Sequence, residues 1–137
     1  MHHNADVRLM LHSYMASVRT LDDVVEASQA AFEQYFTLHQ QDPLFNAIWS
    51  IVQTDAELQK IDLEDTLQNA RYLQGILQPL APDIDSDRLL ATCALLAQFA
   101  VSAGRFARGV PAPLASQIRP IFQQMMRDAI RSGDPKA

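Results

Sequence analysis

A sharp break between two helical segments constrains this chain more than any other feature of its sequence. Aromatic residues at helical spacing lead up to Asp42-Pro43, and further large apolar residues follow at once. The residue before a proline is pushed out of the α region, whereas aspartate caps a helix and proline suits its first turn. The sequence therefore predicts that one helix ends near Gln41 and the next begins at Pro43. The aromatic residues of this corner are Phe32, Tyr35, Phe36, Phe45 and Trp49.

Apolar residues recur at helical spacing along almost the whole chain, and no segment alternates as a strand does. A chain of 137 residues with 48% hydrophobic content is large enough to bury about two thirds of its unfolded surface in one domain. We therefore expect an all-α fold, a single domain over residues 1–137 that forms an orthogonal or antiparallel bundle of about six helices. The expected helices cover about residues 7–18, 21–41, 43–54, 63–78, 86–108 and 114–131.

Polar residues indicate where these helices begin. Thr20 can cap the second helix, and either Asp85 or Ser86 can cap the fifth. The acidic cluster at residues 62–65 is typical of a first helical turn, where carboxylates interact favourably with the helix dipole. We therefore interpret this cluster as the start of the fourth helix and not as a functional group.

Two helices near the end of the chain predict association between subunits. The run 89–103 is apolar around most of its circumference, so we expect other helices to cover nearly every side of it. It is shorter than the roughly 20 residues that span a bilayer, which argues against a membrane anchor. The last helix has a wide apolar stripe, and the two helices can form a four-helix contact across a two-fold dimer, unless both stripes are covered within one subunit. The predicted dimer-interface residues are Ala100, Gly104, Ile118, Phe122, Met125, Met126 and Ala129.

Charge is distributed unevenly, with a net charge of −8 over residues 1–68 and +3 over residues 69–137. The basic residues of the second half are spread over two helices, whereas a duplex-binding protein concentrates them in one positive stripe. We therefore expect these arginines on solvated faces or in ion pairs between subunits. They are Arg105, Arg108, Arg119, Arg127 and Arg131.

The sequence offers little for catalysis or metal binding. All four histidines precede residue 40, no Glu-x-x-His pair exists, and no glycine-rich phosphate loop or nucleophile elbow is present. Cys93 is the only cysteine, which rules out an internal disulfide and fits a cytoplasmic, reducing setting. We therefore expect no enzyme, no cofactor and no metal, and interpret His12 and His39 as packed or surface residues.

The aromatic corner has two interpretations. Its rings can fill the core, as aromatic residues at helical spacing commonly do. Alternatively, the short helix after Asp42 holds its neighbours apart and leaves an apolar cavity with a few polar groups, which is typical of pockets between bundle helices. Those polar groups would be Gln53, Asn69, Tyr72 and Gln98.

This arrangement resembles the C-terminal ligand-binding and dimerisation domain of TetR-type (tetracycline-repressor-like) transcriptional regulators, over about residues 5–132. The resemblance implies a bacterial, cytoplasmic homodimer that binds a small apolar or aromatic effector, with no membrane partner. The matching features are Phe32-x2-Tyr35-Phe36 before Asp42-Pro43, then Phe45 and Trp49, Leu58, Asn69-Ala70-x2-Leu73 and Asp87-Arg88-Leu89-Leu90 after a proline-rich break. The implied ligand-binding residues are Phe36, Phe45, Trp49, Gln53, Asn69, Tyr72, Cys93 and Gln98.

One departure from the family concerns DNA. Such regulators begin with a helix-turn-helix domain of about 50 residues, and nothing before Thr20 can supply it. We therefore expect this chain to control DNA binding only through an N-terminal domain that it lacks. The alternative is a stand-alone α-helical interaction or dimerisation module that binds no ligand.

Overall fold

The computed structural model describes residues 2–41 and 43–132, apart from the side chains of residues 2–8, 39, 43, 45, 46, 49 and 53. Within this part of the chain every regular element is helical, so the predicted all-α fold is confirmed. The elements are α1 (His2–Met15), α2 (Leu21–Gln41), α3 (Pro43–Thr54), α4 (Ala56–Leu77), the 3₁₀ turn η1 (Gln78–Leu80), α5 (Ser86–Gly109) and α6 (Ala112–Arg131).

Side-chain caps explain where three of these helices begin. The Thr20 Oγ1 accepts a hydrogen bond from the amide of Asp23 at 3.1 Å, and the Asp23 carboxylate accepts one from the amide of Thr20 at 3.1 Å, so the two residues cap α2 reciprocally. The Asp85 carboxylate accepts from the amide of Arg88 at 3.0 Å, which confirms Asp85 as the cap of α5. At α4 the cap is Asp55, which accepts from the amide of Glu57 at 2.9 Å.

The Asp55 cap corrects the interpretation of the acidic cluster. Because α4 begins at Ala56, the cluster of Asp62, Glu64 and Asp65 lies in the second and third turns and does not start the helix. A single residue, Asp55, separates the end of α3 at Thr54 from the start of α4 at Ala56, so the sequence contains no long loop that would mark this boundary.

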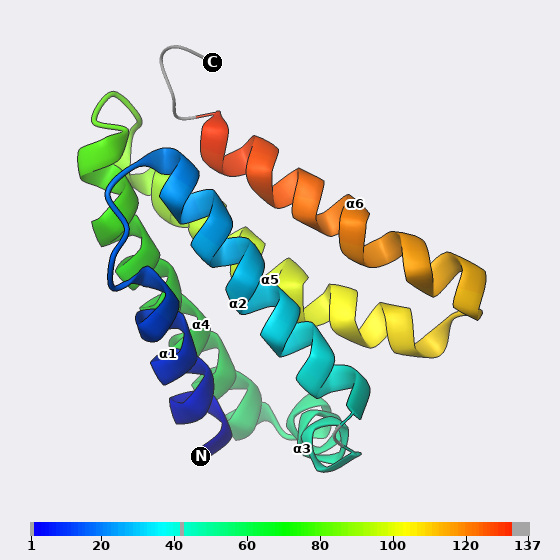
Figure 1. Ribbon diagram of the computed structural model, residues 1–137. Coiled ribbons are helices and arrows are strands. Elements are labelled where there is room, and N and C mark those ends of the chain that lie inside the picture. Colours follow the sequence, from blue (N-terminus) through cyan, green and yellow to red (C-terminus); the bar gives the residue numbers. More distant parts are fainter. Residues whose placement is uncertain (1, 42, 133–137) are drawn as a thin grey trace.

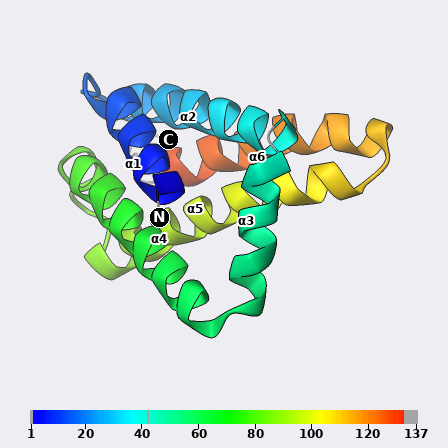
Figure 2. The ribbon, with the colours of Figure 1, turned by 90° about the horizontal axis from the view of Figure 1, so that it is seen from below.

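Helix α5 lies at the centre of the bundle and contacts α2, α4 and α6, while α1 packs on α2 and α4 (Figure 1). Figure 2 shows α3 crossing the end of the molecule between α2 and α4. The central hydrophobic core is drawn from α2, α4, α5 and α6. Its buried members are Val24, Val25, Phe32, Phe36, Ala70, Leu77, Leu89, Cys93, Ala107, Phe122, Met126 and Ile130.

Aromatic and ionic contacts fix α6 against α2. The Phe32 ring lies 4.7 Å from that of Phe122 between centroids, and the Arg119 guanidinium lies 5.6 Å from the Phe36 centroid. Arg119 also pairs with Glu33 at 3.4 Å, and Arg131 pairs with Asp22. These two arginines are about half exposed and make ion pairs within the chain, which agrees with the predicted solvated faces, while ion pairs between subunits stay a prediction.

Within the described part of the chain, helix α5 is covered on one side only, so the expectation that other helices cover nearly every side of it would need a second subunit and stays a prediction. The side chains of Leu95, Phe99 and Phe106 are 53%, 46% and 57% exposed, whereas Leu89, Cys93 and Ala107 on the same helix are buried. In the described residues α5 is also the one helix that length and composition would allow to cross a membrane, a property that core helices share. One apolar side of α5 is thus left exposed by the described residues.

Candidate functional site

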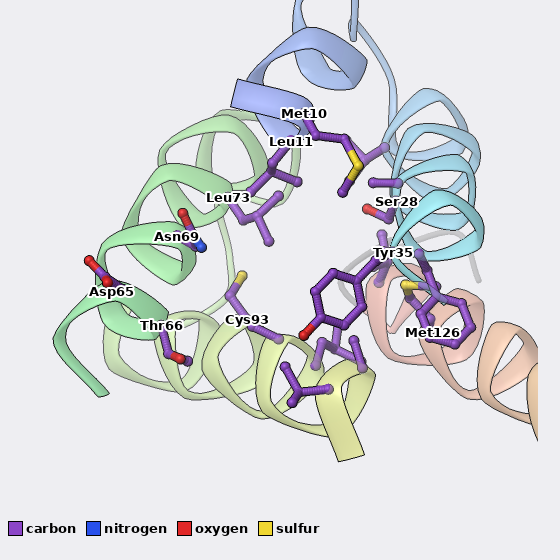
Figure 3. A pocket seen from close by; sticks show the side chains of 18 of the residues that line it. Met10, Leu11, Ser28, Tyr35, Asp65, Thr66, Asn69, Leu73, Cys93 and Met126 are labelled. Carbon is purple, nitrogen blue, oxygen red and sulfur yellow. The ribbon is translucent and has the colours of Figure 1, made fainter. Parts of the chain in front are cut away.

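A cavity of about 160 Å³ lies between α1, α2, α4, α5 and α6 (Figure 3). A cavity of roughly 150 Å³ with apolar walls is large enough to bind benzene. The space in this protein therefore accommodates a molecule with about one ring. The lining residues with apolar side chains are Met10, Leu11, Val24, Ala31, Phe32, Leu73, Leu77, Leu96, Ala97, Ala100, Val101, Met126 and Ile130.

Helix α4 gives the cavity one polar end and one apolar end. Asp62, Asp65 and Asn69 recur every three or four residues and so share the face of α4 that Leu73 and Leu77 continue. Because an α-helix rises about 1.5 Å per residue, the carboxyl of Asp62 and the side chain of Leu73 lie on α4 at levels about 16 Å apart. The remaining polar members of the wall are Ser28, Tyr35, Thr66 and Cys93.

Burial makes ionisation of three wall groups unfavourable. It raises the pKa of the Asp62 carboxyl, and the negative charge of Asp65 raises it further. Burial also raises the pKa of the Tyr35 phenol, with a smaller increase from Asp62 and an opposing effect of Arg105, and it raises the pKa of the Cys93 thiol to about 11. Tyr35 and Cys93 are therefore neutral wall groups, and the thiol is not poised as a nucleophile.

Asn69 has unused hydrogen-bonding capacity at the wall. Its Oδ1 is buried and has no hydrogen-bond partner within the described part of the chain. A buried acceptor without a partner costs free energy, which a donor from a bound molecule can recover.

Two predicted ligand-binding residues, Asn69 and Cys93, line the cavity. Phe36 lies behind the wall, where its ring packs at 5.7 Å from that of Phe32. Tyr72 lies outside the lining and stacks on His12 of α1, with ring centroids 3.7 Å apart. Gln98 is exposed on α5 and does not line the cavity.

The other ligand-binding predictions concern α3. The side chains of Phe45, Trp49 and Gln53 lie outside the described residues. Their role stays a prediction.

Most of the residues predicted for the dimer interface are directed into the subunit. Ala100 and Met126 line the cavity. Gly104 is buried, and its carbonyl accepts a hydrogen bond from the side-chain amide of Gln40 at 3.1 Å. Phe122 is buried in the core, Ile118 packs against it, and Ala129 is half-buried. Met125 is 51% exposed and is the member of the set that is most available to a partner.

The polar end of the cavity was missed from the sequence. The sequence pattern around Asp62 and Asp65 predicts a helix start, and the pattern around Tyr35 predicts an aromatic corner, so neither indicates a polar cavity wall. A detectable signal exists, because Asp62, Asp65 and Asn69 are in register with Leu73 on one helical face. That register places the acidic residues on a buried side of α4.

Comparison with known proteins supplies the family. The family model described as "Tetracyclin repressor-like, C-terminal domain" matches residues 21–118, which include α2 to α5 and the start of α6. Neither a curated protein nor a solved structure matches the chain. The resemblance noted from the sequence is therefore confirmed, and the chain belongs to the family of tetracycline-repressor-like C-terminal domains, the regulatory part of TetR-family regulators.

Proposed function

We propose that residues 1–137 form one effector-sensing and dimerisation domain of a cytoplasmic, bacterial TetR-family transcriptional regulator. A small effector of about one ring binds in the cavity between α1, α2, α4, α5 and α6, and its binding controls a helix-turn-helix domain N-terminal to this chain. The observation that carries this proposal is the cavity of about 160 Å³, whose wall is mainly apolar with a few polar groups.

Dimerisation is proposed through the outer faces of α5 and α6. On α5 the exposed residues Leu95, Phe99 and Phe106 are spaced by four and seven positions, which places them on one side of the helix. On α6 the exposed residues Leu114, Ile121 and Met125 are spaced by seven and four positions and so also lie on one side of the helix. The two helices pack against each other, so a second copy can cover both rows in a four-helix contact.

A neutral, ring-sized probe tests the sensing function. We expect benzyl alcohol to raise the melting temperature of the chain, because a ligand that binds only the folded state stabilises it by mass action. Replacing Cys93 by leucine, which narrows the cavity by about two carbon atoms, is expected to weaken or remove this shift. A shift that persists unchanged in Cys93→Leu would place the probe elsewhere and contradict the cavity as the effector site.

Sedimentation equilibrium of matched variants tests the dimer. Phe99→Glu adds a negative charge to the exposed apolar face of α5, whereas Gln98→Glu adds the same charge about 100° away around the helix. We expect a dimer for the parent chain and for Gln98→Glu, and a monomer for Phe99→Glu. A monomeric parent chain that binds no probe would instead support a stand-alone interaction module.

A further inference from the structure

We propose that the effector of this cavity is a cation, namely a hydrocarbon or aromatic amine whose protonated nitrogen lies at the Asp62–Asp65 end and whose apolar part fills the space beyond it. This inference rests on the proposed sensing function and adds the charge and chemical class of the ligand.

The charged groups of the wall all have one sign. Asp62 and Asp65 line the cavity, and the residues that line it within the described part of the chain include no lysine, arginine or histidine. Arg105 is close enough to act on Tyr35 but is exposed and does not belong to the wall. A carboxylate ligand would therefore meet like charge at this wall, whereas an ammonium ion would meet the opposite charge of Asp62.

Asp62 is the wall group that gains most from such a ligand. It is half-buried, lies one helical turn from Asp65, and has no cationic partner among the described residues. A partly desolvated carboxylate beside another carboxylate is costly in the ionised state, and a cation placed next to both relieves the desolvation and the repulsion together.

Two further wall groups favour the same chemistry. An ammonium group carries three N–H donors and no acceptor, so it binds where the wall offers hydrogen-bond acceptors. The Oδ1 of Asn69, one turn beyond Asp65, is an acceptor without a described partner. Tyr35 projects from α2 across the cavity (Figure 3), and the face of an aromatic ring attracts a nearby cation.

The size of the cavity limits the ligand to about one ring with a short arm. Leu73 and Leu77 continue the acidic face of α4 into the core, so an amine bound at Asp62 directs its apolar part towards them. Benzylamine, protonated at neutral pH, has this composition, and benzyl alcohol and benzoate are its neutral and anionic counterparts of similar size. The three probes separate charge from shape.

The test measures the affinity of these three probes for the full chain by titration calorimetry and thermal shift. We expect benzylamine to bind about tenfold more tightly than benzyl alcohol, which corresponds to about 1.4 kcal/mol, and benzoate to bind most weakly. The double variant Asp62→Asn/Asp65→Asn should bind benzylamine and benzyl alcohol equally. The matched control Glu57→Gln/Glu64→Gln removes the same charge from exposed positions of α4 outside the wall and should keep the tenfold preference.

The outcomes distinguish this inference from the proposed function. Binding of benzyl alcohol with equal or weaker binding of benzylamine would overturn the cationic ligand and leave the sensing function in place. A preference for benzylamine that both double variants lose would assign it to the overall charge of α4 and would also overturn the inference. If none of the probes binds, both proposals fail.

Discussion

Filling the cavity at Cys93 gives the sharpest test of whether the space is real. Cys93 is 1% exposed, and its sulfur points into the cavity towards Leu73 (Figure 3). Replacement by leucine keeps an apolar side chain and adds about two carbon atoms to a space of about 160 Å³. We expect the variant to be more stable than the parent chain and to lose the binding of ring-sized probes.

The size of the stabilisation follows from burial and side-chain entropy. Burying two further carbon groups contributes about 1.6 kcal/mol at about 0.8 kcal/mol each. Fixing the leucine rotamer costs about 0.5–1 kcal/mol. The net gain is about 1 kcal/mol, which for a chain of this length raises the melting temperature by about 3–5 °C.

The assay is urea unfolding together with thermal melting, at one fixed protomer concentration because association also stabilises a folded chain. Forcing extra atoms into a fully packed core costs about 1–3 kcal/mol, so the sign of the change decides between a cavity and a packed core. Cys93→Ser serves as the control, because it leaves the space open and should keep probe binding at a lower stability. A Cys93→Leu variant that is less stable than the parent would refute the cavity.

Three further substitutions on or before α4 test other parts of the structure. Burial raises the pKa of Asp62 in the folded state above that in the unfolded state. The folded protein therefore loses stability as the pH rises from the ordinary carboxyl pKa to the raised pKa of Asp62, because the carboxyl must ionise while it is partly buried. Asp62→Asn should therefore melt higher than the parent at neutral pH and no higher in strong acid, and Glu64→Gln, which removes the same charge from an exposed position of α4, serves as the control. Asp55→Ala removes the two hydrogen bonds that cap α4 and should cost about 1 kcal/mol in urea unfolding, and Asp55→Asn should cost much less. Gly75→Ala adds a methyl group within α4 where no atom lies within 4 Å, so it should stabilise the chain by about 0.5–1 kcal/mol, and a loss of stability would show that the site is crowded.

The helices were predictable because local chemistry marks them. The caps at Thr20 and Asp85 satisfy orphan amides in the way their sequence positions suggest, and prolines lie at the start of α3 and within η1. The start of α4 was not predictable to the same degree. The acidic cluster around Asp62 mimics a first helical turn, so the true cap, Asp55, was overlooked.

It was harder to predict which side of each helix is buried, because that depends on tertiary packing. On α6, Phe122 and Met125 are both apolar and three residues apart, yet Phe122 is buried and Met125 is exposed. The wide apolar stripe of α6 contains both residues, and only the positions of α2 and α5 determine which of the two is buried in the core. The same reason explains why Asp62 and Asp65, polar residues on a helix, were not recognised as part of a cavity wall.

The two parts of the proposed function share the same helices and are therefore physically linked. Ala100 of α5 and Met126 of α6 line the cavity, while their sequence neighbours Phe99 and Met125 lie on the outer face proposed for the dimer. A helix is stiff over one turn and a packed interior compresses little, so a ring that displaces Ala100 or Met126 also displaces the neighbouring outer residue. If effector binding changes the affinity between subunits by some factor, dimerisation must change effector affinity by the same factor. A cavity at this place in the fold thus allows the spacing of the two subunits in the proposed dimer to differ between the effector-bound and the empty state. Control of paired DNA-binding domains requires such a change of spacing.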